Sequence, residues 1–152
     1  MSQPPYLIVA GISKMNNVVA LCFAASALGA TPLIVGLAAV PDSHFEALEP
    51  KFQYLRFAAL SEAAEFLAEK SIPIVGIEIL EEAQPLTLFP FPLDGRIALM
   101  PGNEGTGLSA KQKKVCSAFV FIPQVGAGTA SLNVHVATSL VLHRLATVIA
   151  GK

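Results

Sequence analysis

The sequence predicts an α/β fold in which a parallel β-sheet carries helices on both faces. Short β-branched and apolar runs alternate along the chain with helical segments, which is the pattern of such sheets. Glycine-rich loops follow two of these runs, at the strand ends where parallel sheets bind ligands. The chain has 152 residues, enough for one domain with its own core, and it shows no repeat or linker. We therefore expect a single domain over residues 1–152.

Five apolar runs are predicted to be buried strands. Each is short and rich in Val, Ile or Leu, as strands covered on both faces are. They are residues 6–12, 33–37, 72–80, 96–100 and 119–122. Residues 81–92 contain three prolines and are predicted to be a loop with at most an edge strand. Residues 41–59 have a mixed pattern that predicts no element.

The first predicted helix covers residues 18–28. Its residues are small and apolar nearly all round, so most of its sides must be buried. Asn16 or Asn17 stands where a helix N-cap is expected.

Three further helices are predicted downstream. Residues 61–70 begin at Ser61, an expected cap, with glutamate near the start and lysine at the end. Residues 111–116 form a short helix. Residues 131–150 form a long amphipathic one, for which Ser131 is the expected cap.

The composition excludes several classes of protein. Hydrophobic residues make up 53% and charged residues 14%, against about 25% charged in an ordinary soluble domain. A subunit interface or a membrane could cover the surplus apolar surface. Residues 18–40 lack charge and are long enough to span a bilayer. However, Gly29, Thr31, Pro32 and Gly36 interrupt them, which favours a helix that ends before a strand and thus no membrane span.

The charge and the cysteines indicate the compartment and the kind of partner. The N-terminus has no basic segment ahead of its apolar run, so it does not look like a secretory signal. The formal net charge of -1 excludes a protein that grips nucleic acid by charge alone. Cys22 and Cys116 are far apart without CxxC spacing, which predicts reduced, packed thiols in an intracellular compartment.

Three segments are candidates for chemistry. Residues 101–109 (PGNEGTGLS) let the backbone approach a ligand and carry one carboxylate, Glu104, but match neither a Walker nor a Rossmann loop. Residues 122–134 run from a strand through a loop into a helix, whose first N–H groups can bind an acceptor. Asn16–Asn17 open the first helix. Each segment could instead be an ordinary turn or cap.

The histidines do not predict a metal centre. His135 and His143 are eight residues apart and share one side of the last helix, but the three histidines lack metal-ligand spacing. We expect no metal, and a packing or accessory role for these side chains. Nothing in the order of Ser, His and Asp indicates a hydrolase.

The loops together resemble a known family. LMPGNEGTGLS resembles the second motif of SpoU-type (TrmH-like) RNA 2′-O-ribose methyltransferases of the SPOUT α/β-knot superfamily, G-x-E-x-x-G-[LI]-S after a strand. IPQVGAGTASLNVHVATSLVL resembles their third motif, and NNVVALCFAASALG their first. The motifs occur in the family order over nearly the whole chain.

The resemblance implies a fold, a cofactor and partners. The C-terminal part of the sheet would be threaded into a deep trefoil knot, a very rare feature. The protein would be a homodimer built on the first and last helices, which would account for the low charge. S-adenosylmethionine would be the cofactor and S-adenosylhomocysteine the product. The partner would be RNA (tRNA or rRNA) in the cytoplasm, with no DNA and no membrane.

The resemblance also assigns site residues by position. The implied catalytic residues are Asn17, Glu104, Ser131 and Asn133. The implied cofactor-binding residues are Ile77, Glu78, Gly102, Asn103, Gly105, Ile122, Pro123, Gln124, Ser131, Leu132, Asn133 and Ala137. We expect no separate RNA-binding domain, so Lys111, Lys113 and Lys114 are the candidate phosphate contacts, unless they form only a solvated helix face.

One position departs from the family pattern. Phe23 stands where the family has an arginine thought to help deprotonate or position the ribose 2′-hydroxyl, and a phenyl ring can do neither. Lys14, Arg96, Arg144 and His135 are candidate replacements. Two functions follow: an active methyltransferase acting on the ribose 2′-O, or an impaired relative that binds cofactor or RNA as a dimer. A base nitrogen or a protein as methyl acceptor is the remaining alternative.

Overall fold

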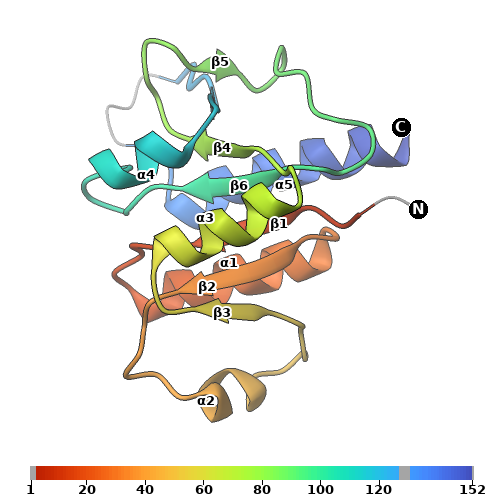
Figure 1. Cartoon of the computed structure of the whole chain (residues 1–152). Helices are drawn as coiled ribbons and strands as arrows, with labels where there is room; N and C mark the ends of the chain where they lie inside the picture. The colour runs from red at the N-terminus through yellow and green to blue at the C-terminus, as the bar shows by residue number, and fades with distance from the viewer. Residues whose placement is uncertain (1–2, 127–130, 152) are drawn as a thin grey trace.

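A single seven-stranded sheet organises the chain (Figure 1). The computed structural model describes residues 3–126 and 131–151. The strands are β1 (Tyr6–Val9), β2 (Thr31–Val35), β3 (Leu55–Phe57), β4 (Ile74–Ile77), β5 (Gln84–Pro85), β6 (Ala98–Pro101) and β7 (Ala118–Phe121). Their order is β3-β2-β1-β6-β4-β7-β5, and each neighbouring pair is parallel. The predicted parallel sheet is confirmed.

Helices cover both faces, as predicted. They are α1 (Met15–Ala27), α2 (Asp42–Glu46), α3 (Leu60–Glu69), α4 (Ala110–Val115) and α5 (Val134–Ala150). In Figure 1, α3 and α4 lie in front of the sheet, whereas α1 and α5 lie behind it. Clusters of apolar side chains lie between the sheet and the helices on each face.

The period of the strands divides the core into two halves. In β1, Leu7 and Val9 belong to the cluster under α1 and α5, whereas Tyr6 and Ile8 belong to the cluster under α3. Successive strand side chains point to opposite faces, so a strand covered twice must be apolar throughout. This explains the continuous apolar runs in the sequence.

The first helix differs in detail from its prediction. It starts at Met15, its N-cap is Lys14, and no side chain caps it locally. Asn17 lies in the first turn and is buried, so the expected cap at Asn16 or Asn17 is wrong. A stripe containing Leu21 and Ala25 is buried, but other positions are exposed. The helix is therefore less enclosed within one chain than its composition predicts.

The other expected caps also moved. Helix α3 starts at Leu60 after Ala59, so Ser61 is not its cap. Helix α5 starts at Val134, and its cap is Asn133 rather than Ser131. Asn133 accepts a hydrogen bond from the backbone N–H of His135 at 2.8 Å, the geometry that makes asparagine a good N-cap.

Two short segments filled the region without a clear pattern. Residues 41–59 form α2 and the edge strand β3, anchored by Arg56, which donates to backbone carbonyls of Val40 and Leu37. Residues 81–92 contain only the two-residue edge strand β5, as the prolines predicted.

No helix among the described residues is both long and apolar enough to cross a bilayer. The uncharged stretch is instead α1 followed by β2.

Candidate functional site

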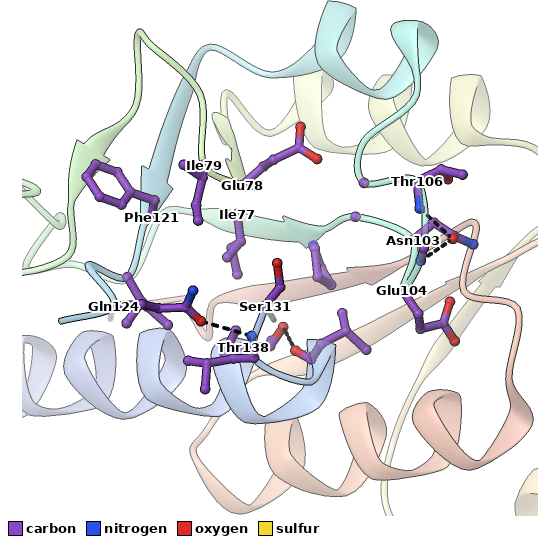
Figure 2. A pocket seen from close by; sticks show the side chains of 18 residues that line it. Ile77, Glu78, Ile79, Asn103, Glu104, Thr106, Phe121, Gln124, Ser131 and Thr138 are labelled. Carbon is purple, nitrogen blue, oxygen red and sulfur yellow. Dashed lines mark hydrogen bonds between the residues drawn. The ribbon is translucent and has the colours of Figure 1, made fainter. Parts of the chain in front are cut away.

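A pocket of about 370 Å³ opens at the carboxyl ends of β4, β6 and β7 (Figure 2). Three adjacent parallel strands end there, and the start of α5 closes the remaining side, as ligand sites in α/β sheets commonly do. Its described lining residues are Ile77, Glu78, Ile79, Pro101, Gly102, Asn103, Glu104, Gly105, Thr106, Gly107, Phe121, Ile122, Gln124, Ser131, Leu132, Val134, Ala137 and Thr138. Apolar walls beside polar loop groups suit a small amphipathic ligand.

The loop after β6 is held by Asn103. The side-chain oxygen of Asn103 accepts from the backbone N–H groups of Gly105 and Thr106 at 2.8 and 3.1 Å. Its amide nitrogen donates to the carbonyl of Gly11 and the hydroxyl of Ser13, each at 2.8 Å. One side chain thus shapes its own loop and docks it against the loop after β1.

Glu104 joins the same loop to the start of α1. Its carboxylate accepts from the backbone N–H groups of Ser13 and Lys14 and from the side-chain amide of Asn17, at 3.0, 2.9 and 2.9 Å. Partial desolvation raises the pKa of Glu104, but these hydrogen bonds outweigh it and lower the pKa from 4.5 to about 2. Glu104 is therefore ionised at neutral pH and is a poor proton acceptor. From a distant loop it caps α1 by accepting from the backbone N–H of the N-cap residue Lys14.

Glu78 connects the loops after β4 and β6. Its Oε1 accepts from the backbone N–H of Leu108 at 2.9 Å, and its Oε2 lies 3.9 Å from Nζ of Lys113. Gly107 has a φ of +73°, and a Cβ there would lie 1.7 Å from Glu78 Oε1. Only glycine allows this backbone conformation together with this carboxylate.

Gln124 holds the two ends of the last loop together. Its Oε1 accepts from the backbone N–H of Leu132 at 2.9 Å. Figure 2 places Gln124 and Phe121 at the opposite end of the pocket from Asn103 and Glu104. The middle of the third motif, residues 127–130, lies outside the described residues.

A chain of amides runs from Glu104 to α5. Besides donating to Glu104, Asn17 accepts through Oδ1 from the side-chain amide of Asn133 at a long 3.5 Å. Oδ1 of Asn133 in turn lies 3.0 Å from Nδ1 of His135. The three motifs of the sequence analysis thus meet in one polar arrangement.

Most residues expected to hold the cofactor line the pocket. Those that do are Ile77, Glu78, Gly102, Asn103, Gly105, Ile122, Gln124, Ser131, Leu132 and Ala137, together with Glu104. Pro123 is not among the lining residues. Asn17 and Asn133 are not either; Asn17 contacts the lining residue Glu104, and Asn133 lies between the lining residues Leu132 and Val134 in the chain.

Sequence reasoning missed several participants. The backbone N–H groups of Ser13 and Lys14 hold Glu104, but backbone donors leave no trace in a sequence. Thr138 is fully buried and lines the pocket, with its hydroxyl donating to the carbonyl of Val134. Thr138 lies one helical turn after Val134 and therefore on the same side of α5, which is the pattern by which the sequence could have placed it in the pocket.

Phe23 is not part of the pocket lining. Its ring packs edge-to-face against Phe52, with centroids 5.6 Å apart and an interplanar angle of 86°. Phe52 in turn packs against Tyr54. The residue that departs from the family pattern therefore serves an aromatic cluster between α1 and the segment before β3.

Comparison with known proteins gives a consistent result. Residues 4–143 match the SpoU rRNA Methylase family. The chain is 31% identical over 148 residues to the 23S rRNA (guanosine-2′-O-)-methyltransferase RlmB of Escherichia coli K12, covering 93% of this chain and 59% of RlmB. The chain thus spans about three-fifths of the length of the RlmB sequences that it matches.

Solved structures share the fold. A crystal structure of an RNA 2′-O ribose methyltransferase superposes with a TM-score of 0.77 at 25% identity, covering all of this chain and 59% of that one. A structure concerned with the 2-OH methylation of C/U34 on tRNA gives a TM-score of 0.78 at 20% identity, covering 97% of both chains. The second likeness concerns the fold alone.

Proposed function

Because this chain belongs to the SpoU rRNA Methylase family, we propose that it is an S-adenosylmethionine-dependent RNA methyltransferase that modifies a ribose 2′-hydroxyl of tRNA or rRNA. The observation that carries this proposal is the convergence of the three family motifs. Residues 101–107 and the described parts of the third motif, 122, 124, 131, 132 and 134, line the pocket, and Asn17 contacts its lining residue Glu104. RlmB acts on a guanosine 2′-O of 23S rRNA by its name, which supports the reaction class.

The pocket fits the proposed cofactor. Its volume of about 370 Å³ is within the range of small-molecule sites. Ile79 and Leu132 expose 61% and 41% of their surface although they are apolar, and an adenine ring would cover them. The polar end near Asn103 would hold the ribose and amino-acid portion. When bound, S-adenosylmethionine supplies a methyl group on a sulfonium sulfur and leaves as S-adenosylhomocysteine.

The RNA would approach beside this pocket. Asn133 is exposed and lies next to the lining rather than in it, so a methyl acceptor could reach it while the cofactor fills the pocket, whereas Asn17 is buried. Glu104 orients Asn17, and Asn133 is held as the cap of α5. Ser131 lines the pocket and is exposed, which places its hydroxyl within reach of either ligand.

We further propose a homodimer. Val136 and Leu140, one turn apart on α5, expose 39% and 45% of their surface. This apolar stripe and the half-buried apolar positions of α1, such as Val19 and Ala20, support a homodimer. We also propose the C-terminal trefoil knot, a single methyltransferase domain over residues 1–152, and action in the cytoplasm. Lys111, Lys113 and Lys114 are exposed and remain the proposed phosphate contacts, although Lys113 also lies 3.9 Å from Glu78.

The direct test is methyl incorporation into RNA. RNA from cells that lack the protein is incubated with purified protein and methyl-labelled S-adenosylmethionine, and digested nucleosides are separated to identify the product. We expect a 2′-O-methylnucleoside from wild type and strongly reduced product from Asn133→Ala. If wild type binds S-adenosylhomocysteine calorimetrically but labels no RNA pool, the binding-only alternative replaces the enzyme.

A further inference from the structure

We propose that His135 is the general base of the reaction, with Nε2 as the atom that receives the proton of the ribose hydroxyl. This inference rests on the proposed function. It starts from the hydrogen-bond pattern around Asn133, which determines which nitrogen of the His135 ring carries hydrogen.

The orientation of Asn133 is set by a donor that cannot reverse. The backbone N–H of His135 can only donate, and it lies 2.8 Å from Oδ1 of Asn133. That atom is therefore the amide oxygen, and an amide oxygen only accepts. The His135 ring nitrogen Nδ1 lies 3.0 Å from the same oxygen, so Nδ1 must carry the hydrogen.

Glu104 supports the same polarity from the other side. Its carboxylate, ionised above its lowered pKa of about 2, only accepts, so Asn17 faces it with its amide NH₂ at 2.9 Å. Oδ1 of Asn17 then points to the NH₂ of Asn133 at 3.5 Å. Every group along the chain agrees on one direction of donation, which begins at Nδ1–H of His135 and ends at the carboxylate of Glu104.

Hydrogen on Nδ1 leaves the lone pair of a neutral imidazole on Nε2. Within residues 3–126 and 131–151, no hydrogen bond occupies Nε2 of His135. His135 is half-buried and lies in the first turn of α5, beside the capping residue Asn133 and directly after Val134, which lines the pocket. This pairing of an oriented imidazole with a fixed oxygen is the arrangement of a general base.

The neighbouring groups do not offer this chemistry. Glu104 holds a proton poorly because three donors stabilise its carboxylate. The amides of Asn17 and Asn133 do not titrate. Phe23, at the position of the family arginine, is packed against Phe52. Histidine ordinarily titrates closest to neutral pH, which suits it to replace the missing group.

The step balances as follows. The 2′-hydroxyl O–H bond breaks and its proton moves to Nε2, giving an imidazolium that Asn133 Oδ1 stabilises through Nδ1–H. The hydroxyl oxygen uses its electron pair to bond the methyl carbon of the sulfonium donor. The pair of the broken carbon–sulfur bond stays on sulfur, which becomes a neutral thioether. The imidazolium then releases its proton to water.

The tautomer can be measured without any reaction. Nitrogen-15 correlation spectra of the imidazole rings distinguish Nδ1–H from Nε2–H at a pH where the rings are neutral. We expect Nδ1–H for His135 in wild type and the usual Nε2–H form in Asn133→Ala. His143, two turns along the same helix and exposed, is the internal control and should not change. Nε2–H at His135 in wild type, or Nδ1–H retained in Asn133→Ala, overturns the proposal.

The catalytic role is tested by His135→Gln, which can hydrogen-bond but cannot take a proton. We expect RNA methylation to fall by about 10²- to 10⁴-fold, while the affinity for S-adenosylhomocysteine and the melting temperature stay near wild type. His143→Gln should retain full activity. If His135→Gln retains wild-type rate, the base is not His135 although the protein is an enzyme. If wild type itself transfers no methyl, the proposed function fails instead.

Discussion

The side-chain amide of Asn17 donates a 2.9 Å hydrogen bond to the carboxylate of Glu104, 87 residues away in sequence. This contact joins the first helix to the loop after β6, and the same carboxylate accepts from the backbone N–H of Lys14, the N-cap residue of α1, whose own side chains provide no cap. It ties a pocket loop to the helix that carries Phe23. Because an uncapped helix start leaves N–H groups unsatisfied, the same contact matters for stability.

Glu104→Gln should therefore destabilise the protein at neutral pH by about 1–2 kcal/mol, a figure reduced for solvent screening of a partly exposed group. The pKa of Glu104 is lowered from 4.5 to about 2 in the folded protein. Its stabilisation is thus complete above about pH 5 and decreases as the pH falls toward 2. Urea unfolding at pH 7, 5 and 3 should show the gap between wild type and variant closing. Glu82→Gln, at an exposed position, should show no gap; a constant gap for Glu104→Gln would contradict the lowered pKa.

Gly107→Ala should cost more stability than Gly36→Ala. Both glycines have positive φ, +73° and +77°, but a Cβ has open space at Gly36 and would collide with Glu78 at Gly107. We expect about 1 kcal/mol for Gly36→Ala from backbone strain, and about 1–3 kcal/mol more for Gly107→Ala from the collision. Denaturant unfolding checks both values. Glu78→Ala should recover part of the loss in Gly107→Ala, and a lack of recovery would argue against the collision.

Phe23→Arg should weaken the fold without increasing methyl transfer. The change removes the edge-to-face pair with Phe52, which is worth about 0.5–1.5 kcal/mol, and position 23 is not in the pocket lining. Thermal unfolding and the RNA methylation assay measure the two effects, with Phe23→Leu as the apolar control. A faster reaction in Phe23→Arg would show that position 23 still reaches the substrate.

Gln124→Met should lower the affinity for S-adenosylhomocysteine by about five- to tenfold. Loss of the hydrogen bond to the N–H of Leu132 at 2.9 Å removes about 1 kcal/mol of loop preorganisation. Isothermal titration calorimetry gives the dissociation constant. Gln124→Glu keeps an acceptor oxygen and should bind more tightly than Gln124→Met. Equal affinities for the two variants would mean that this hydrogen bond does not shape the pocket.

Both thiols should resist alkylation in the folded protein. Burial raises the pKa of Cys22 to about 12; burial, together with the nearby charge of Glu78, raises that of Cys116 to about 12. Because the thiolate is the reactive form, iodoacetamide at pH 8 should modify neither within the time that modifies both in denaturant. Mass spectrometry after digestion identifies each site. Rapid modification of Cys116, the less buried thiol, would show that its helix opens readily.

The sequence predicted the strands well because burial on both faces leaves a local record. The runs that became β1, β2, β4, β6 and β7 are continuously apolar, whereas β3 and β5 at the sheet edges are short and leave little signal. Caps were predicted poorly. Asn17 and Ser61 have cap chemistry, yet tertiary contacts or backbone conformation placed the true helix starts elsewhere.

By itself, the sequence determined the fold class, the family and most of the pocket residues, because strand periodicity and the glycine-rich motifs depend on neighbours in the chain. Only the tertiary structure determined which partners each polar or aromatic side chain contacts. Glu104 became a cap for a helix 87 residues away, Phe23 joined an aromatic cluster, and Asn133 oriented the ring of His135. The direction of a hydrogen bond and the pKa of a side chain depend on which donors and acceptors lie close together in space. The order of residues along the chain does not show which distant groups come into contact.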